Sequence, residues 1–183
     1  MHALSASVVL EFCKICSWAY EVWLNHRELF DHNPRATELQ KSRAGDELAR
    51  LSVISQEYAL LQIVKLHDRA VMNDNVTLGI DYIVTYGGWS DSIRAHLGGL
   101  ANEMKALVSK LRGARNKSLS HNDLATIVAG ATLGAFAQGA DDRYFEVLQE
   151  FVNTVHEQVI GGPWPFDDIV KNDVAAFLAT VKP

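Results

Sequence analysis

Apolar residues return every three or four positions along most of this chain, and this spacing limits what the chain can fold into. Such steps place side chains on one face of an α-helix, and no stretch shows the convincing alternation of a half-buried strand. The sequence therefore predicts an all-α bundle of about five to six helices. The expected helices cover residues 4–30, 46–72, 76–86, 91–117, 140–160 and 167–181.

The helix expected over 46–72 is apolar on more than one side. Leu60 and Ile63 extend its apolar surface nearly around the helix, which indicates burial between several helices or at a dimer seam. Within the helix expected over 91–117, Gly98 and Gly99 would allow another helix to approach closely. The face of 46–72 that we expect to be buried comprises Leu48, Leu51, Ile54, Tyr58, Leu61, Val64 and Leu66 or Ala70.

The size and charge of the chain narrow the functional classes. At 183 residues, 48% of them hydrophobic, we expect one domain over 1–183 with its core at about 45–160. The net charge of −5 excludes a generally basic nucleic-acid surface, so RNA contact requires a local patch. Glu103 is the only acid between residues 94 and 117, a stretch that is either a phosphate-binding face or a solvated helix face. Its six basic residues are Arg94, Lys105, Lys110, Arg112, Arg115 and Lys117.

Cysteine usage and hydropathy point to a cytoplasmic protein. Cys13 and Cys16 lie one helical turn apart in an apolar setting and have no second Cys pair, so we expect buried thiols in a reducing compartment. No signal peptide is expected at the start of the sequence, because no basic run precedes its apolar residues. The longest apolar stretch, 124–137, is too short to span a bilayer, and no membrane partner is expected.

One polar segment, Leu111–Asp123, combines an arginine, an amide and a histidine where a helical pattern breaks. Arg115 and His121 are six residues apart, which leaves them roughly 120° from a common face on an unbroken helix. They meet only if the chain bends between them or if they pair across a dimer axis. If Ser120 caps a new helix, the helix dipole disfavours a charged His121, and a neutral imidazole can accept a proton. A neutral histidine beside a guanidinium suits acid–base chemistry on a phosphate ester.

Three motifs in order resemble the HEPN superfamily, specifically its abortive-infection, AbiU2-like branch. Arg115-Asn116 followed by His121 is similar to the superfamily's Arg-polar-x4-His signature. Residues 60–69, ending in Leu66-His67-Asp68-Arg69, resemble the branch's leucine-rich helix, and Asn75–Leu78 resembles the start of its next helix. The resemblance implies a dimeric HEPN-like helical bundle.

The resemblance also implies a function: a metal-independent endoribonuclease of toxin or phage-defence type, acting on RNA at a dimer cleft. Arg115, His121 and Asn116 would be catalytic, and Arg112 and Lys117 would bind flanking phosphates. Asp68 is either an acid that orients Arg115 or His121 and so supports substrate binding, or a residue that makes a structural ion pair or caps a neighbouring helix. An antitoxin partner fits this reading. Some HEPN toxins carry a tyrosine, modified by a partner nucleotidyltransferase, two residues after the histidine, where this chain has Asp123.

Two other classes compete with the nuclease. In a catalytically inactive HEPN module, Arg115 and His121 would grip a nucleotide or RNA, or only close a helix end. A helical-bundle metalloenzyme would need the Glu-x-x-His spacing, which the sequence lacks despite seven histidines. We therefore expect no metal and no other cofactor.

Overall fold

Helices dominate the computed structural model, which describes residues 4–109, 111 and 136–181. The all-α fold class is confirmed. The only sheet among the described residues is one hairpin, whose two strands have two residues each. The elements are α1 (Ala6–His26), ending in a π-helical turn η1 (Arg27–Asp31), α2 (Ala36–Gln40), α3 (Gly45–Lys65), β1 (Val71–Met72), β2 (Asn75–Val76), α4 (Ile80–Tyr86), α5 (Asp91–Leu107), α8 (Ala140–Val159) and α9 (Ile169–Thr180).

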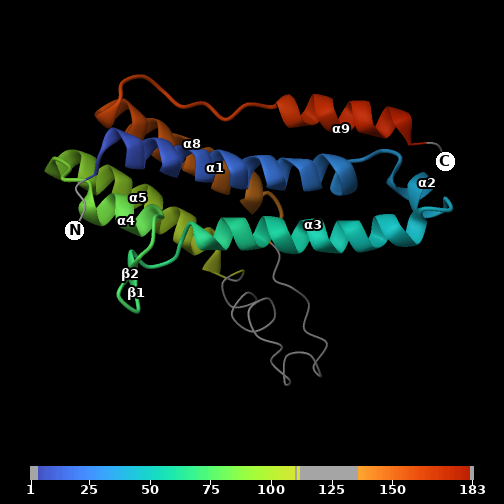
Figure 1. Ribbon diagram of the computed structural model, residues 1–183, viewed down its shortest axis with the longest axis horizontal. Helices are drawn as coiled ribbons and strands as arrows, with labels where there is room; N and C mark the ends of the chain where they lie inside the picture. Colours follow the sequence, from blue (N-terminus) through green and yellow to red (C-terminus); the bar gives the residue numbers. More distant parts are fainter. Residues whose placement is uncertain (1–3, 110, 112–135, 182–183) are drawn as a thin grey trace.

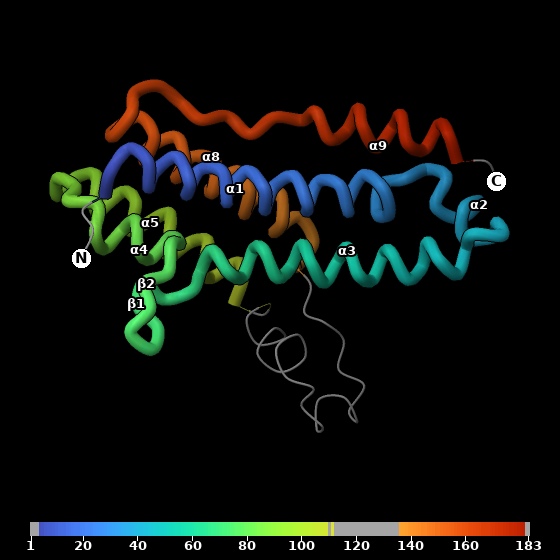
Figure 2. The backbone as a smooth tube through the Cα atoms, viewed as in Figure 1, coloured from blue at the N-terminus to red at the C-terminus, as the bar shows by residue number. Residues whose placement is uncertain are grey.

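The long helix α1 is the centre of the arrangement. It packs against α3, α8 and α9, while α5 packs on α8 and carries the short α4 beside it. In Figure 1 the helices α9, α1 and α3 lie side by side, with α8 behind α1. The tube in Figure 2 shows α1 and α3 running in opposite directions. No helix in the described part of the chain has both the length and the apolarity that a bilayer crossing requires.

The core is continuous across α1, α3, α4, α5 and α8. Phe12 of α1 meets Phe151 of α8 edge to face, with ring centroids 5.9 Å apart, and Trp23 lies 4.4 Å from Phe145. Cys13 and Cys16 are fully buried free thiols, as the sequence predicted. Burial raises the pKa of the Cys13 thiol to about 11. Eight buried side chains come from α1, which precedes the 45–160 span, and they lie at Val9, Phe12, Cys13, Cys16, Ala19, Trp23, Leu24 and His26.

The segment after α3 differs from the prediction of one helix over 46–72. The helix ends at Lys65, and the chain forms a hairpin in which Val71 pairs with Val76. Asn73 and Asp74 both adopt positive φ, 49° and 66°, at its turn. Two successive residues with positive φ suit the twist of a tight hairpin, and Asn and Asp tolerate this conformation. As a result, α4 begins at Ile80 rather than at residue 76.

The expected buried face of α3 was wrong in its first half. Leu51, Ile54 and Tyr58 are 45%, 59% and 43% exposed. Burial on α3 is concentrated in its last two turns, where Ala59, Leu60, Ile63 and Val64 contribute to the core. No described helix makes the close approach that Gly98 and Gly99 could allow, because a Cβ at either position would meet none of the described residues within 4 Å.

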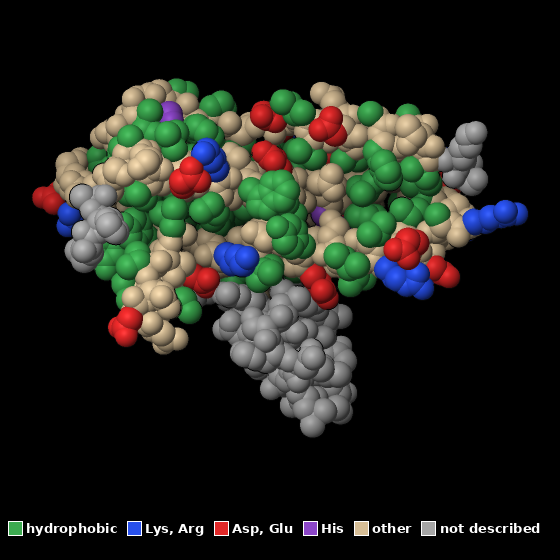
Figure 3. Space-filling model, viewed as in Figure 1, with side chains coloured by type: hydrophobic (Ala, Val, Ile, Leu, Met, Phe, Trp, Pro, Cys, Tyr) green, Lys and Arg blue, Asp and Glu red, His purple; other side chains and the backbone are tan. Residues whose placement is uncertain are grey.

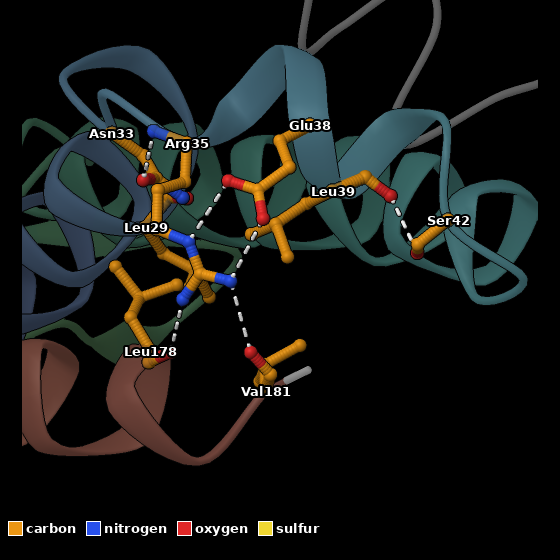
Figure 4. Close-up of polar contacts among 8 residues, drawn as sticks. All are labelled: Leu29, Asn33, Arg35, Glu38, Leu39, Ser42, Leu178 and Val181. Atoms are coloured by element: carbon orange, nitrogen blue, oxygen red, sulfur yellow. Dashed lines mark hydrogen bonds and ion pairs between the residues drawn. The ribbon is translucent and has the colours of Figure 1, made fainter. Parts of the chain in front are cut away.

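The last helix, α9, is held mainly at its ends. Only Val174 of α9 is buried. Arg35, just before α2, donates to the carbonyl oxygens of Leu178 (2.7 Å) and Val181 (3.0 Å), as Figure 4 shows. Glu38 holds the same guanidinium at 3.2 Å. Arg35 thus satisfies carbonyls that a helix C-terminus leaves without partners, where a positive charge is favourable.

Candidate functional site

A cleft of about 710 Å³ opens where α3 ends against the hairpin, α4 and α5. These elements lie together at one end of the molecule in Figure 1. Polar and charged side chains line it together with small apolar ones. The lining residues are His67, Arg69, Ala70, Val71, Ile80, Asp81, Val84, Thr85, Tyr86, Gly98, Ala101, Asn102 and Lys105.

Backbone hydrogen bonds fix the wall of the cleft that follows α3. The Ile80 N–H donates to the Leu66 carbonyl at 2.9 Å, so the start of α4 is tied to the end of α3. The Ala70 N–H donates to the Asp81 carboxylate at 2.8 Å. Gly79 is required at this crossing, because a Cβ there would lie 2.8 Å from the Leu66 carbonyl oxygen. These contacts hold the two ends of the segment 66–81 together, so it borders the cleft rather than continuing the helix.

Two cations face this cleft from different elements. Arg69 follows α3, and Lys105 lies in the last turn of α5; both side chains are exposed. Neither makes an ion pair with any other residue that the structure describes. Asp81 is the one carboxylate in the lining, and it already accepts the Ala70 N–H. Two cations that pair with no described carboxylate, beside Asn102 and Thr85, suit a phosphate group, which needs positive charge and hydrogen-bond donors.

A buried polar pair lies beside the cleft, and one of its two members, His67, lines the cleft. His67 is 8% exposed, and its Nε2 lies 3.0 Å from the hydroxyl of the fully buried Tyr144 on α8. Burial holds the pKa of Tyr144 well above its usual value, so the phenol stays protonated. The pair joins α8 to the chain that follows α3, so His67 has a structural role.

Of the six predicted site residues, only Asp68 lies among the described residues. It is half-buried between His67 and Arg69 and does not line the cleft. The other five, Arg112, Arg115, Asn116, Lys117 and His121, lie outside the described residues. The convergence of Arg115 and His121 therefore stays a prediction.

Sequence reasoning assigned no site role to Arg69, and it named Lys105 only as one of six basic residues of a possible phosphate-binding face. Arg69 closes the leucine-rich motif at residues 60–69, and Lys105 belongs to the basic stretch after residue 94. The motif and the basic stretch drew attention to both residues. That both line one cleft depends on the hairpin, which the sequence pattern did not predict. Within residues 4–109, 111 and 136–181, no three His, Cys, Asp or Glu side chains are grouped so that they could hold a metal ion.

Comparison with known families gives a match over nearly the whole chain. Residues 3–178 match the family described as AbiU2, within the HEPN group of domains. No curated protein and no solved structure matches the chain. The match includes α1, the cleft and the Arg115–His121 segment, and it agrees with the resemblance seen in three short motifs. The chain therefore belongs to the HEPN AbiU2 family.

Proposed function

We propose that this protein is a metal-independent endoribonuclease of toxin or phage-defence type, which cleaves RNA in the cytoplasm as a dimer. The observation that carries the proposal is the Arg115-Asn116 and His121 motif inside a family match that covers residues 3–178. An antitoxin that restrains the enzyme is part of the same proposal. Arg115 follows Leu111, a buried residue after α5, by four positions. In the sequence, the motif therefore comes shortly after α5, the helix that carries Lys105.

The proposed reaction is a transesterification within the RNA strand. Neutral His121 takes the proton from a 2′-hydroxyl, and the 2′-oxygen forms a bond to the adjacent phosphorus. The bond from phosphorus to the 5′-oxygen breaks, and His121 of the second copy, in its protonated form, donates a proton to that oxygen. Arg115 stabilises the negative charge of the phosphorane by paired hydrogen bonds, and Asn116 orients the phosphate. The products are a 2′,3′-cyclic phosphate and a 5′-hydroxyl.

The cleft beside α5 supports the proposal by offering a path for the RNA backbone. Arg69 and Lys105 would bind phosphates that flank the cleaved one, together with Arg112 and Lys117. Asp68, next to Arg69 in sequence, would position neighbouring groups rather than touch the RNA. A local group of cations suffices, because backbone binding requires charge only where the phosphates pass.

Cleavage of a short RNA in the presence of a chelator tests the proposal. We expect the His121→Ala and Arg115→Ala variants to lose roughly a hundredfold or more in cleavage rate. His32→Ala is the matched control, since His32 is exposed at the end of η1, and it should cleave like the wild type. Equal rates for His121→Ala and wild type would contradict the assignment.

A binding module without catalysis is the second candidate, and the two exposed cations that line the cleft, Arg69 and Lys105, favour it as well. Titration with short RNA and with nucleotides, followed by fluorescence anisotropy, separates the two functions. The Arg69→Ala/Lys105→Ala double variant should bind RNA more weakly, and its salt dependence should fall by about 1.4 in the log–log slope. Arg50→Ala is the control, because Arg50 is paired with Glu47 on α3. Binding without cleavage products would favour the module.

A further inference from the structure

The outer surface of α1 and α3 carries an apolar patch that the fold leaves uncovered. It consists of Ile15 and Trp18 on α1 and Leu51, Ile54 and Tyr58 on α3, each between 38% and 59% exposed. We call these five residues the α1/α3 face. Figure 3 shows hydrophobic side chains gathered over α1 and α3 on the side of the molecule in view.

The spacing on α3 shows that this face is separate from the core. Leu51, Ile54 and Tyr58 stand at steps of three and four, so they form one stripe along the helix. The buried residues Ala59 and Ile63 lie on a different side, which packs into the core. Thus α3 has two apolar sides, and in the described part of the chain only one of them packs into the core.

The two aromatic members of the face are held in place before anything binds. Trp18 Nε1 donates to the Tyr58 hydroxyl at 3.3 Å, which links α1 to α3 at the middle of the face. Fixed aromatic side chains lose little conformational freedom on association. Trp and Tyr are also the residues that most often dominate binding energy at protein interfaces.

The charges beside the face favour a copy of the same chain. One helical turn before the apolar residues, Glu11 pairs with Lys14 on α1 at 2.7 Å, and Glu47 pairs with Arg50 on α3 at 2.9 Å. Because α1 and α3 run in opposite directions, these neutral pairs lie toward opposite ends of the face. A twofold copy would meet no net charge from these two pairs, although the chain carries a net charge of −5.

The size of the face fits the centre of a protein interface. The exposed parts of its five side chains amount to on the order of 400 Å², given about 150–250 Å² for a large side chain. A standard interface buries roughly 800 Å² on each partner, with an apolar centre and a polar rim. The face therefore supplies about half of that area, and the neighbouring polar residues would form the rim.

We propose that a second copy of this chain docks on the α1/α3 face in an isologous contact. Trp18 and Tyr58 lie at the centre of the contact, and Leu51 and Ile54 pack around them. The inference supplies an interface for the dimer of the proposed function. It is independent of RNA cleavage, because it depends only on these exposed side chains.

Sedimentation equilibrium and light scattering over the micromolar concentration range test the proposal. The wild-type chain should show a dimer whose fraction rises with concentration. Ile54→Glu and Trp18→Glu should each raise the dissociation constant about tenfold or more, since each would bury a charge in the apolar centre. Val53→Glu is the matched control: Val53 is 51% exposed on α3 but points about 100° away from Ile54. This control should associate like the wild type, and circular dichroism should show native helix content for all three variants.

Three results would overturn the proposal. They are a monomeric wild type, a dimer unaffected by Ile54→Glu and Trp18→Glu, and a Val53→Glu variant that dissociates as much as they do. A monomeric wild type would mean that the α1/α3 face binds a different protein rather than a second copy. The RNA assay is separate, so a dimer that depends on Ile54 but cleaves nothing contradicts the proposed function alone.

Discussion

The two C-terminal helices, α8 and α9, are attached to the same central helix α1 in different ways. Eight residues of α8 are buried, and two of them, Phe145 and Phe151, meet aromatic rings of α1. By contrast, α9 buries only Val174 and relies on polar contacts at its ends. Arg35 donates to the carbonyls at its C-terminus, and the Tyr20 hydroxyl donates to Asp168 at its N-terminus at 2.7 Å. This difference indicates that α8 is part of the cooperative core, whereas α9 packs on the surface of the bundle.

The largest effect is expected from removing a ring in α8. Phe151→Ala should lower the free energy of unfolding by about 3–5 kcal/mol, because Phe151 is fully buried and its loss leaves a cavity. Phe177→Ala on α9 is the matched control, since that ring is half-exposed, and it should cost less than about 1 kcal/mol. Urea unfolding measures both values. Equal losses would mean that α9 is as much a part of the core as α8.

An intermediate effect is expected from releasing the end of α9. Arg35→Ala removes the hydrogen bonds to Leu178 and Val181, and α9 should open more easily by about 1–2 kcal/mol. Native-state hydrogen exchange would show faster exchange in residues 169–180, with α8 unchanged. Arg50→Ala removes only an exposed pair with Glu47, and it should leave exchange in α9 as in the wild type. Faster exchange in α8 after Arg35→Ala would refute the separation of the two helices.

The smallest effect concerns a buried histidine between α1 and the start of α8. His26 is 7% exposed, and its Nδ1 has no hydrogen-bond partner among the described residues. It lines a cavity of about 200 Å³ together with Asp31 and Asp141. Burial lowers the pKa of His26, while Asp31, 3.7 Å away, opposes this shift.

The sign of the pH dependence follows from that lowered pKa. As pH falls below the ordinary value of histidine, the unfolded chain takes up the proton before the folded one, so His26 destabilises the fold increasingly until its folded pKa is reached. The contribution of His26 to the pH dependence of the unfolding free energy stays below about 1.4 kcal/mol per pH unit, the limit for one proton. His26→Leu should flatten the fall in unfolding free energy between about pH 7.5 and 5.5, as urea unfolding at several pH values would measure. If the unfolding free energy falls equally steeply with decreasing pH in His26→Leu and in the wild type, His26 does not cause the fall.

The helices were predictable where local signals and tertiary packing agree. The bounds of α8 were predicted closely, because its apolar stripe ends at Ile160, before Gly161 and Gly162, which both adopt positive φ. The end of α3 was not, because Leu66 and Ala70 continue the apolar spacing beyond the last helical residue. Both side chains are buried, so the pattern identified the core correctly but not the backbone that carries them.

The candidate site was less predictable than the fold, for a physical reason. The motif at Arg115 and His121 is a local pattern, and a family match now includes it, but its spatial arrangement stays a prediction. Arg69 and Lys105 are 36 positions apart in sequence and meet at one cleft only because the chain turns back after Lys65. Spacing rules describe single helices, so they cannot anticipate a pairing that a turn between elements creates.

The burial of Cys13 and Cys16 has a practical consequence for spectroscopy. They are the only two cysteines of the chain, both are fully shielded, and burial raises the pKa of each thiol, so neither should react with maleimide in the folded protein. A cysteine introduced on the surface would then accept a single fluorophore or spin label without prior removal of the native thiols. Distances between two such labels could report directly on how copies of the chain assemble.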